Sequence, residues 1–267
     1  MKLEIPGEHG LRDAVSKVPQ VTLMFWIVKV LATTVGETGG DAVSMTLQLG
    51  YAMASFVFLA FFVAALFVQL RSDRYRPAVY WAVVVATTTV GTTMSDYLDR
   101  TAGLGYVKSS ALLLAAVIAV LVLWRWTTGR LAFDDIRTRR EECFYWVTIL
   151  VSNTLGTALG DFVATTAGLG FEQGALVFSG LLALVGLAYK FSGRVPTSVL
   201  FWAAYVLTRP LGATLVDTLT KTHQEGGFEL GRIQSSLVIG AAMSVGILLM
   251  ASRNRNAIAS TPASGRR

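Results

Sequence analysis

Aspartate recurs at one fixed position in four apolar stretches of the sequence. Each aspartate follows a glycine by five residues and a tryptophan by fifteen, so every copy reads W-x9-G-x4-D. The four copies contain Trp26, Gly36 and Asp41; Trp81, Gly91 and Asp96; Trp146, Gly156 and Asp161; and Trp202, Gly212 and Asp217. A bare carboxylate at low dielectric is very costly, so such a residue binds a positive charge or takes up a proton. The repeated pattern therefore indicates chemistry with cations or protons.

Further polar residues share the helix face of these aspartates. With 3.6 residues per turn, positions 4, 8, 11 and 15 after each tryptophan fall on one stripe. The stripe gains a second acid only in the first copy, and position 8 is threonine in three copies. Carboxylate and hydroxyl ligands without Cys or His favour a hard cation such as Mn²⁺ or Mg²⁺, or a proton. We therefore predict a cation- or substrate-binding site made of Glu37, Asp41, Asp96, Asp161, Asp217, Thr34, Thr89 and Thr154.

Two basic residues also fall inside apolar stretches. Arg209 stands just outside the stripe of the fourth copy, at position 7, and is predicted to pair with one of the acids, either as permanent bracing or as a gate. Lys29 lies deeper in the first copy and either joins such a gate or extends to the cytoplasmic edge. With five acids against two bases, the membrane region has a formal excess of three negative charges, which protonation or a bound cation would relieve.

The recurring residues also have structural interpretations. Tryptophan favours the membrane interface, which we expect to explain its position better than ligand stacking does. The glycines either let helices approach closely or interrupt the helix and expose carbonyl groups to an ion. The aspartates form a functional acid site or anchor the loop that follows. An acid at a helix C-terminus opposes the helix dipole, so four such placements require a reason.

Eight apolar stretches of about 20 residues carry these patterns, which is the length a helix needs to cross a bilayer. Of the 267 residues, 53% are hydrophobic and 15% are charged, against about 25% charged in soluble domains. The runs are continuous rather than alternating, which indicates helices and not a β-barrel. We predict an all-α integral membrane protein with about eight transmembrane helices. They cover Thr22–Asp41, Leu47–Leu70, Ala78–Tyr97, Val107–Trp126, Cys143–Thr165, Gln173–Phe191, Pro196–Asp217 and Ile233–Ala251.

The basic residues predict the topology. Seventeen of the 23 lysines and arginines lie at the termini or in alternate connections, which places both termini in the cytoplasm and makes a nucleic-acid partner unnecessary. We expect a cytoplasmic segment at 1–20 without a cleaved signal peptide, one transmembrane domain at 21–251, and a disordered cytoplasmic tail at 252–267. The two-helix repeats cover about 21–74, 76–130, 141–194 and 196–251. They are parallel, and they either surround one axis or pair into two halves.

The repeat resembles the tandem unit of an uncharacterised family of bacterial multi-pass membrane proteins, known as a repeat of unknown function. The resemblance covers about Val21 to Ala251. The residues that carry it are the four tryptophans and the run G-E-T-G-G-D at Gly36–Asp41, with its counterparts G-T-T-M-S-D, G-T-A-L-G-D and G-A-T-L-V-D. It implies four copies of two membrane helices in the bacterial cytoplasmic (inner) membrane, and it implies no activity.

These residues predict a secondary transporter or exporter of a small cation, either a divalent metal such as manganese or one coupled to protons. The alternative is a non-transporting membrane scaffold or partner-binding subunit. We expect no enzyme, because no nucleophile–base pair is recognisable, and no cofactor. The only cysteine, Cys143, excludes an intrachain disulfide, and His9 and His223 fall on opposite sides of the predicted membrane. The expected partners are the lipid bilayer and a small cation, and a homo-oligomer is left open.

Overall fold

The computed structural model describes residues 17–136, 138–225 and 227–259, and all regular secondary structure in these ranges is helical. The α-helices are α2 (Leu23–Asp41), α3 (Gly50–Arg71), α4 (Pro77–Asp96), α5 (Gly105–Thr128), α6 (Arg139–Asp161), α7 (Gly170–Phe191), α8 (Thr197–Thr220) and α9 (Arg232–Ala259). They coincide with the eight predicted stretches, which confirms the all-α class. Most of the predicted segment 1–20 and the end of the predicted tail lie outside the described residues, and α9 runs to Ala259, beyond the expected domain end at 251.

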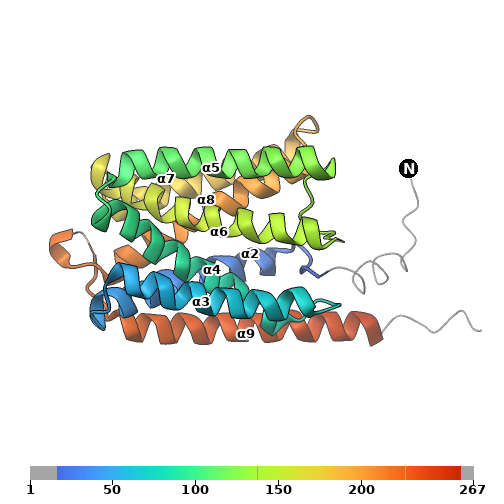
Figure 1. The fold of residues 1–267 in the computed structure, drawn as a ribbon, viewed down its shortest axis with the longest axis horizontal. Coiled ribbons are helices and arrows are strands. Elements are labelled where there is room, and N and C mark those ends of the chain that lie inside the picture. Colours follow the sequence, from blue (N-terminus) through green and yellow to red (C-terminus); the bar gives the residue numbers. More distant parts are fainter. Residues whose placement is uncertain (1–16, 137, 226, 260–267) are drawn as a thin grey trace, which may run out of the picture.

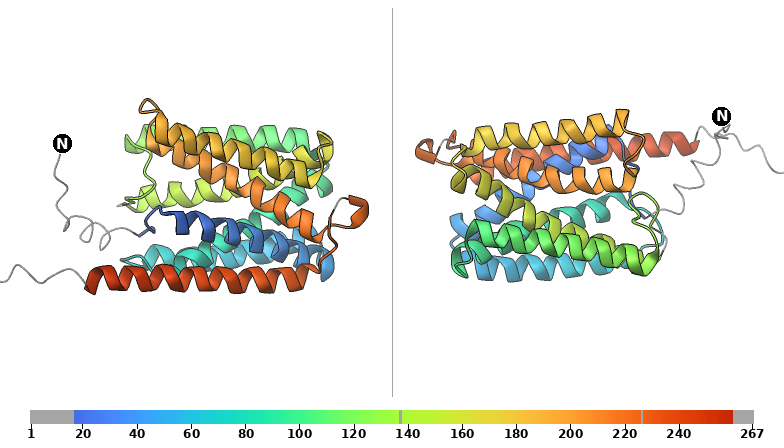
Figure 2. Two further views of the ribbon diagram at one scale, coloured as in Figure 1. Left: turned by 180° about the vertical axis from the view of Figure 1, so that it is seen from behind. Right: turned by 90° about the horizontal axis from the view of Figure 1, so that it is seen from above.

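The first helix of each repeat belongs to an inner ring. Helix α2 packs against α4, α4 against α6, α6 against α8, and α8 against α2. The second helix of each repeat lies outside and packs against the inner helix of the next repeat: α3 on α4, α5 on α6, α7 on α8, and α9 on α2 (Figures 1 and 2). The four repeats therefore close around one axis. The other arrangement left open by the sequence, in which the repeats pair into two halves, is wrong.

The outer helices are the most apolar and the least buried. Six described helices are long and apolar enough to cross a membrane. In the apolar windows of α3, α5, α7 and α9 only 11–28% of residues are buried, against 67% in α6 and 61% in α8. Helices α2 and α4, with 19 and 20 residues, are long enough to cross a membrane but less apolar than these six helices. Apolar side chains outside and polar ones inside are typical of a membrane protein.

The repeated glycine is the point where neighbouring inner helices touch. A Cβ atom on Gly36 would meet Thr88, one on Gly91 would meet Asn153, one on Gly156 would meet Arg209, and one on Gly212 would meet Thr33. Each glycine thus faces position 7 of the next repeat, and the fourth repeat closes on the first. The helices continue unbroken through the glycines, so close approach is confirmed and the interrupted-helix alternative is wrong.

The tryptophans form a closed ring of aromatic contacts at the other end of the inner helices. The residue before each tryptophan is also aromatic, and it contacts the tryptophan of the next repeat. The pairs are Phe25–Trp81, Tyr80–Trp146, Tyr145–Trp202 and Phe201–Trp26, with ring centroids 5.4–5.7 Å apart. Trp81, Trp146 and Trp202 are at most 2% exposed, so these three face the bundle interior, and their position at the membrane interface stays a prediction. They fill the core because aromatic packing between adjacent helices removes their large apolar surface from the surroundings.

Candidate functional site

The axis-facing side chains of the inner helices form layers along the bundle. One column of each helix, at positions −1, 3, 7, 11 and 15 relative to the tryptophan, is at most 5% exposed throughout. The stripe predicted from the sequence, at positions 0, 4, 8, 11 and 15, matches this column at positions 11 and 15. At its first three positions the stripe lies one residue too far along the chain. A column spaced by four residues is inclined to its helix axis, so it faces the centre only where helices cross obliquely. The left view of Figure 2 shows α8 running obliquely to α9.

A buried ion pair crosses the ring near its middle. Arg209 of α8 lies with one guanidinium nitrogen, Nη2, 2.6 Å from Oε2 of Glu37 on α2. The same nitrogen donates to the Thr92 hydroxyl at 2.6 Å, and this hydroxyl donates to Glu37 at 2.8 Å. The predicted pairing of Arg209 with an acid is confirmed, and its partner is Glu37. The contact joins the first, second and fourth repeats, so it stabilises ring closure.

Lys29 points into the bundle. Its side chain is 0% exposed, and its ammonium group lies 4.4 Å from the centre of the Tyr205 ring and donates to the Thr33 hydroxyl at 3.0 Å. The alternative of an extension to the membrane edge is therefore wrong. The cation–π contact with Tyr205 partly replaces the hydration that the ammonium group has lost.

The four repeated aspartates are buried at the opposite end of the ring from the tryptophans, with 2–5% of each residue exposed. Their partners are bases of the outer connections: Arg100 with Asp96 at 3.3 Å and with Asp161 at 3.5 Å, Lys221 with Asp217 at 3.6 Å, and Arg232 with Asp41 at 3.7 Å. None of these three bases belongs to the site predicted from the sequence. Together with Lys29 and Arg209 they balance the five acids, so the formal excess of three negative charges disappears.

The aspartates of different repeats share these counter-ions. Burial lowers the pKa of Lys221, but the carboxylates of Asp217, Asp41 and Asp161 outweigh this effect and raise the pKa above its usual value. Three repeats therefore act on one ammonium group. Asp96 and Asp217 pair with a base of their own connection, but Arg100 also reaches Asp161 of the next repeat, so the carboxylates gather at one end of the bundle.

The hydroxyl groups predicted to assist the acids are committed to their own helices. Thr34, Thr89 and Thr154 each donate to the carbonyl four residues earlier, at 2.8–3.0 Å. Such bonds satisfy a buried hydroxyl without a ligand. Among the described residues no hydrogen bond joins these threonines to the acids, so their role as ligands stays a prediction.

A π-helical turn follows each of the first three aspartates. These turns are η1 (Ala42–Thr46), η2 (Tyr97–Thr101) and η3 (Phe162–Thr166). The chain then reverses through a glycine in the left-handed region, such as Gly50 with φ of 73°. The fourth repeat instead keeps an α-helix to Thr220, followed by the 3₁₀ turn η4 (His223–Glu225). Single π turns are rare and often occur at functional sites, and no sequence pattern used above indicated them.

The repeats match a known family. The model of the family described as Repeat of Unknown Function (DUF347) matches residues 24–75, 79–130, 144–194 and 200–256. The chain belongs to this family. No curated protein and no solved structure matches it.

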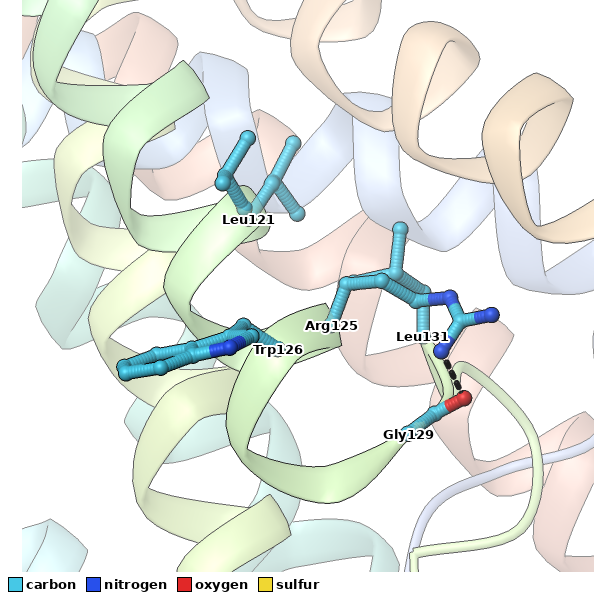
Figure 3. A pocket seen from close by; sticks show the side chains of 6 residues that line it. Leu121, Arg125, Trp126, Gly129 and Leu131 are labelled. Atoms are coloured by element: carbon cyan, nitrogen blue, oxygen red, sulfur yellow. Dashed lines mark hydrogen bonds between the residues drawn. The ribbon is translucent and has the colours of Figure 1, made fainter.

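In this DUF347 protein the buried acids form ion pairs with lysine and arginine side chains and are not free to bind a metal ion. No group of three His, Cys, Asp or Glu residues in the described ranges is arranged to hold a metal ion. The hollow in Figure 3 lies at the end of α5, between Leu121, Arg125, Trp126 and Leu131, and no carboxylate lines it. A cation reaching the acids must therefore displace Arg100, Lys221 or Arg232.

Proposed function

We propose that this protein is a secondary membrane transporter or exporter that moves a small cation along the axis of the inner ring. The cargo is a divalent metal such as Mn²⁺, or a cation whose movement is coupled to protons. One observation carries the proposal: five acids from all four repeats are buried around a shared axis, and lysine and arginine side chains neutralise them. Ionisable residues inside membrane proteins mark ion and proton pathways.

The outer bases suit a displaceable gate. Their distances to the aspartates are 3.3–3.7 Å, which is long for an ion pair, and the Arg100 side chain is 34% exposed. An entering cation can therefore compete with Arg100, the most exposed of the three bases, for the carboxylates of Asp96 and Asp161. At the other end the aromatic ring of tryptophans closes the bundle. The described conformation then corresponds to a closed, charge-balanced state of an alternating-access cycle.

The test is uptake of radiolabelled Mn²⁺, and separately of protons, into proteoliposomes. We expect Glu37→Gln and Asp41→Asn to reduce uptake by about 10- to 100-fold, as loss of a group that supports an ion site does. Asp73→Asn is the matched control, because Asp73 is exposed in the loop between α3 and α4. Full uptake by both site variants would eliminate the proposed cation site.

The proposed location is the bacterial cytoplasmic membrane, crossed by all eight helices, with both termini in the cytoplasm. The less apolar α2 and α4 can cross because neighbouring helices shield them from lipid. We expect Cys143, exposed near the start of α6, to react with a membrane-impermeant maleimide in inverted vesicles and not in intact cells. Lys108→Cys in a Cys143→Ser chain, which moves the thiol to the start of α5, should show the reverse. The opposite labelling pattern would show that both termini lie outside the cytoplasm.

A scaffold or partner-binding subunit is the second candidate. The closed glycine contacts between all four inner helices favour it, because they indicate a rigid ring. In that case, Asp→Asn changes lower the melting temperature in detergent without any change in ion flux. The proteoliposome measurement therefore distinguishes the two functions.

A further inference from the structure

The middle of the bundle contains more positive than negative charge. Lys29 and Arg209 are both 0% exposed. Glu37 pairs with Arg209, but no described carboxylate lies within ion-pair distance of Lys29. The layer thus has a local excess of one positive charge, about 12 Å along the helix from Arg209 to Asp217 and about 18 Å from Lys29 to Asp41. A buried ammonium group without a counter-ion either gives up its proton or binds a negative partner, and the unused donors nearby favour the partner.

Unused hydrogen-bond donors occur on Tyr205, whose ring the Lys29 ammonium group contacts, and on Arg209, one turn along the same helix. Nε and Nη1 of Arg209 are buried and have no partner, and the hydroxyl of Tyr205 is also buried without one. Tyr205 precedes Arg209 by one helical turn, and the Lys29 ammonium group lies over its ring. Buried polar atoms are usually paired, so the three unpartnered atoms on these two side chains are available to the acceptor atoms of a ligand. The ligand must accept hydrogen bonds and carry negative charge.

We propose that a small monovalent oxyanion, such as a short carboxylate, binds between Lys29 and Arg209 with the Tyr205 hydroxyl as a further donor. A planar guanidinium edge offering two N–H groups suits the two oxygens of a carboxylate. Water alone would satisfy the donors and leave the charge uncompensated. This anion site is separate from the cation site at the aspartates, and it requires no transport.

The test is thermal unfolding of the full-length protein in detergent during a potassium acetate titration, with ionic strength kept constant by potassium chloride. We expect a saturable rise in melting temperature for the wild type. Tyr205→Phe removes one donor to a charged ligand, so the half-saturating acetate concentration should rise about tenfold. Lys29→Met should abolish the response, and Lys108→Met, at an exposed position of α5, should leave it unchanged.

The acetate titration tests the anion site alone, so its outcome does not depend on the flux measurements that test the cation site. If Lys29→Met does not fold, the comparison of wild type with Tyr205→Phe remains decisive, because that change removes a single unpartnered oxygen. A wild-type response that does not saturate, or equal half-saturation in wild type and Tyr205→Phe, would overturn the anion site.

Discussion

Replacement of Arg209 by methionine should destabilise the protein by about 3–5 kcal/mol, the usual cost of removing one partner of a buried ion pair. The change leaves the Glu37 carboxylate buried with only the Thr92 hydroxyl as its partner. The measurement is thermal or denaturant unfolding in detergent. Arg194→Met, in the exposed loop between α7 and α8, is the control and should have little effect.

The double variant Glu37→Gln, Arg209→Met separates charge from packing. Because it removes both charges, it should recover much of the lost stability. Equal destabilisation of the single and double variants would show that Arg209 acts through its bulk against Gly156 and not through its charge.

Replacement of Gly91 by alanine should open the inner ring. The new Cβ would lie 2.9 Å from the carbonyl carbon of Asn153 and 3.0 Å from the nitrogen of Thr154. Both atoms belong to the backbone of α6, which cannot move away by rotating a side chain. We expect a loss of about 1–3 kcal/mol, as overpacking of a tight core usually costs, and a lower melting temperature.

Gly39 supplies the matched control for this substitution. It also lies in an inner helix, α2, but no atom is within 4 Å of the Cβ that alanine would add. Gly39→Ala should therefore be neutral or stabilise by up to about 1 kcal/mol, because alanine favours the helix. Similar effects of the two changes would contradict the close approach of α4 to the backbone of α6 at Gly91.

The sequence predicted the features that repeat locally. Hydropathy gave the helices, and the spacing of Gly36 and Asp41 from Trp26 recurred in every copy, which predicted the parallel units. The aromatic residue before each tryptophan was also a readable signal, and it would have indicated the closed ring of contacts. These features depend on short spacings along one helix, which the sequence contains directly.

The counter-ions could not be predicted in the same way. Arg100 lies four residues after Asp96, but it also reaches Asp161 on another inner helix, and Arg232 reaches back from α9 to Asp41. These contacts depend on ring closure and on how each loop folds over the bundle end. A helical-wheel argument contains neither. It also assumes a fixed facing direction, which explains the shift of one residue in the predicted stripe before Glu37.

The most direct test of the shared acid site compares cation flux in four single variants: Asp41→Asn, Asp96→Asn, Asp161→Asn and Asp217→Asn. If the carboxylates of four repeats act on one cation, each variant should lose uptake to a similar degree, while Asp73→Asn retains it. Melting temperatures measured beside the flux would separate loss of the site from loss of the fold. Undiminished flux in folded variants would contradict a common site on the bundle axis.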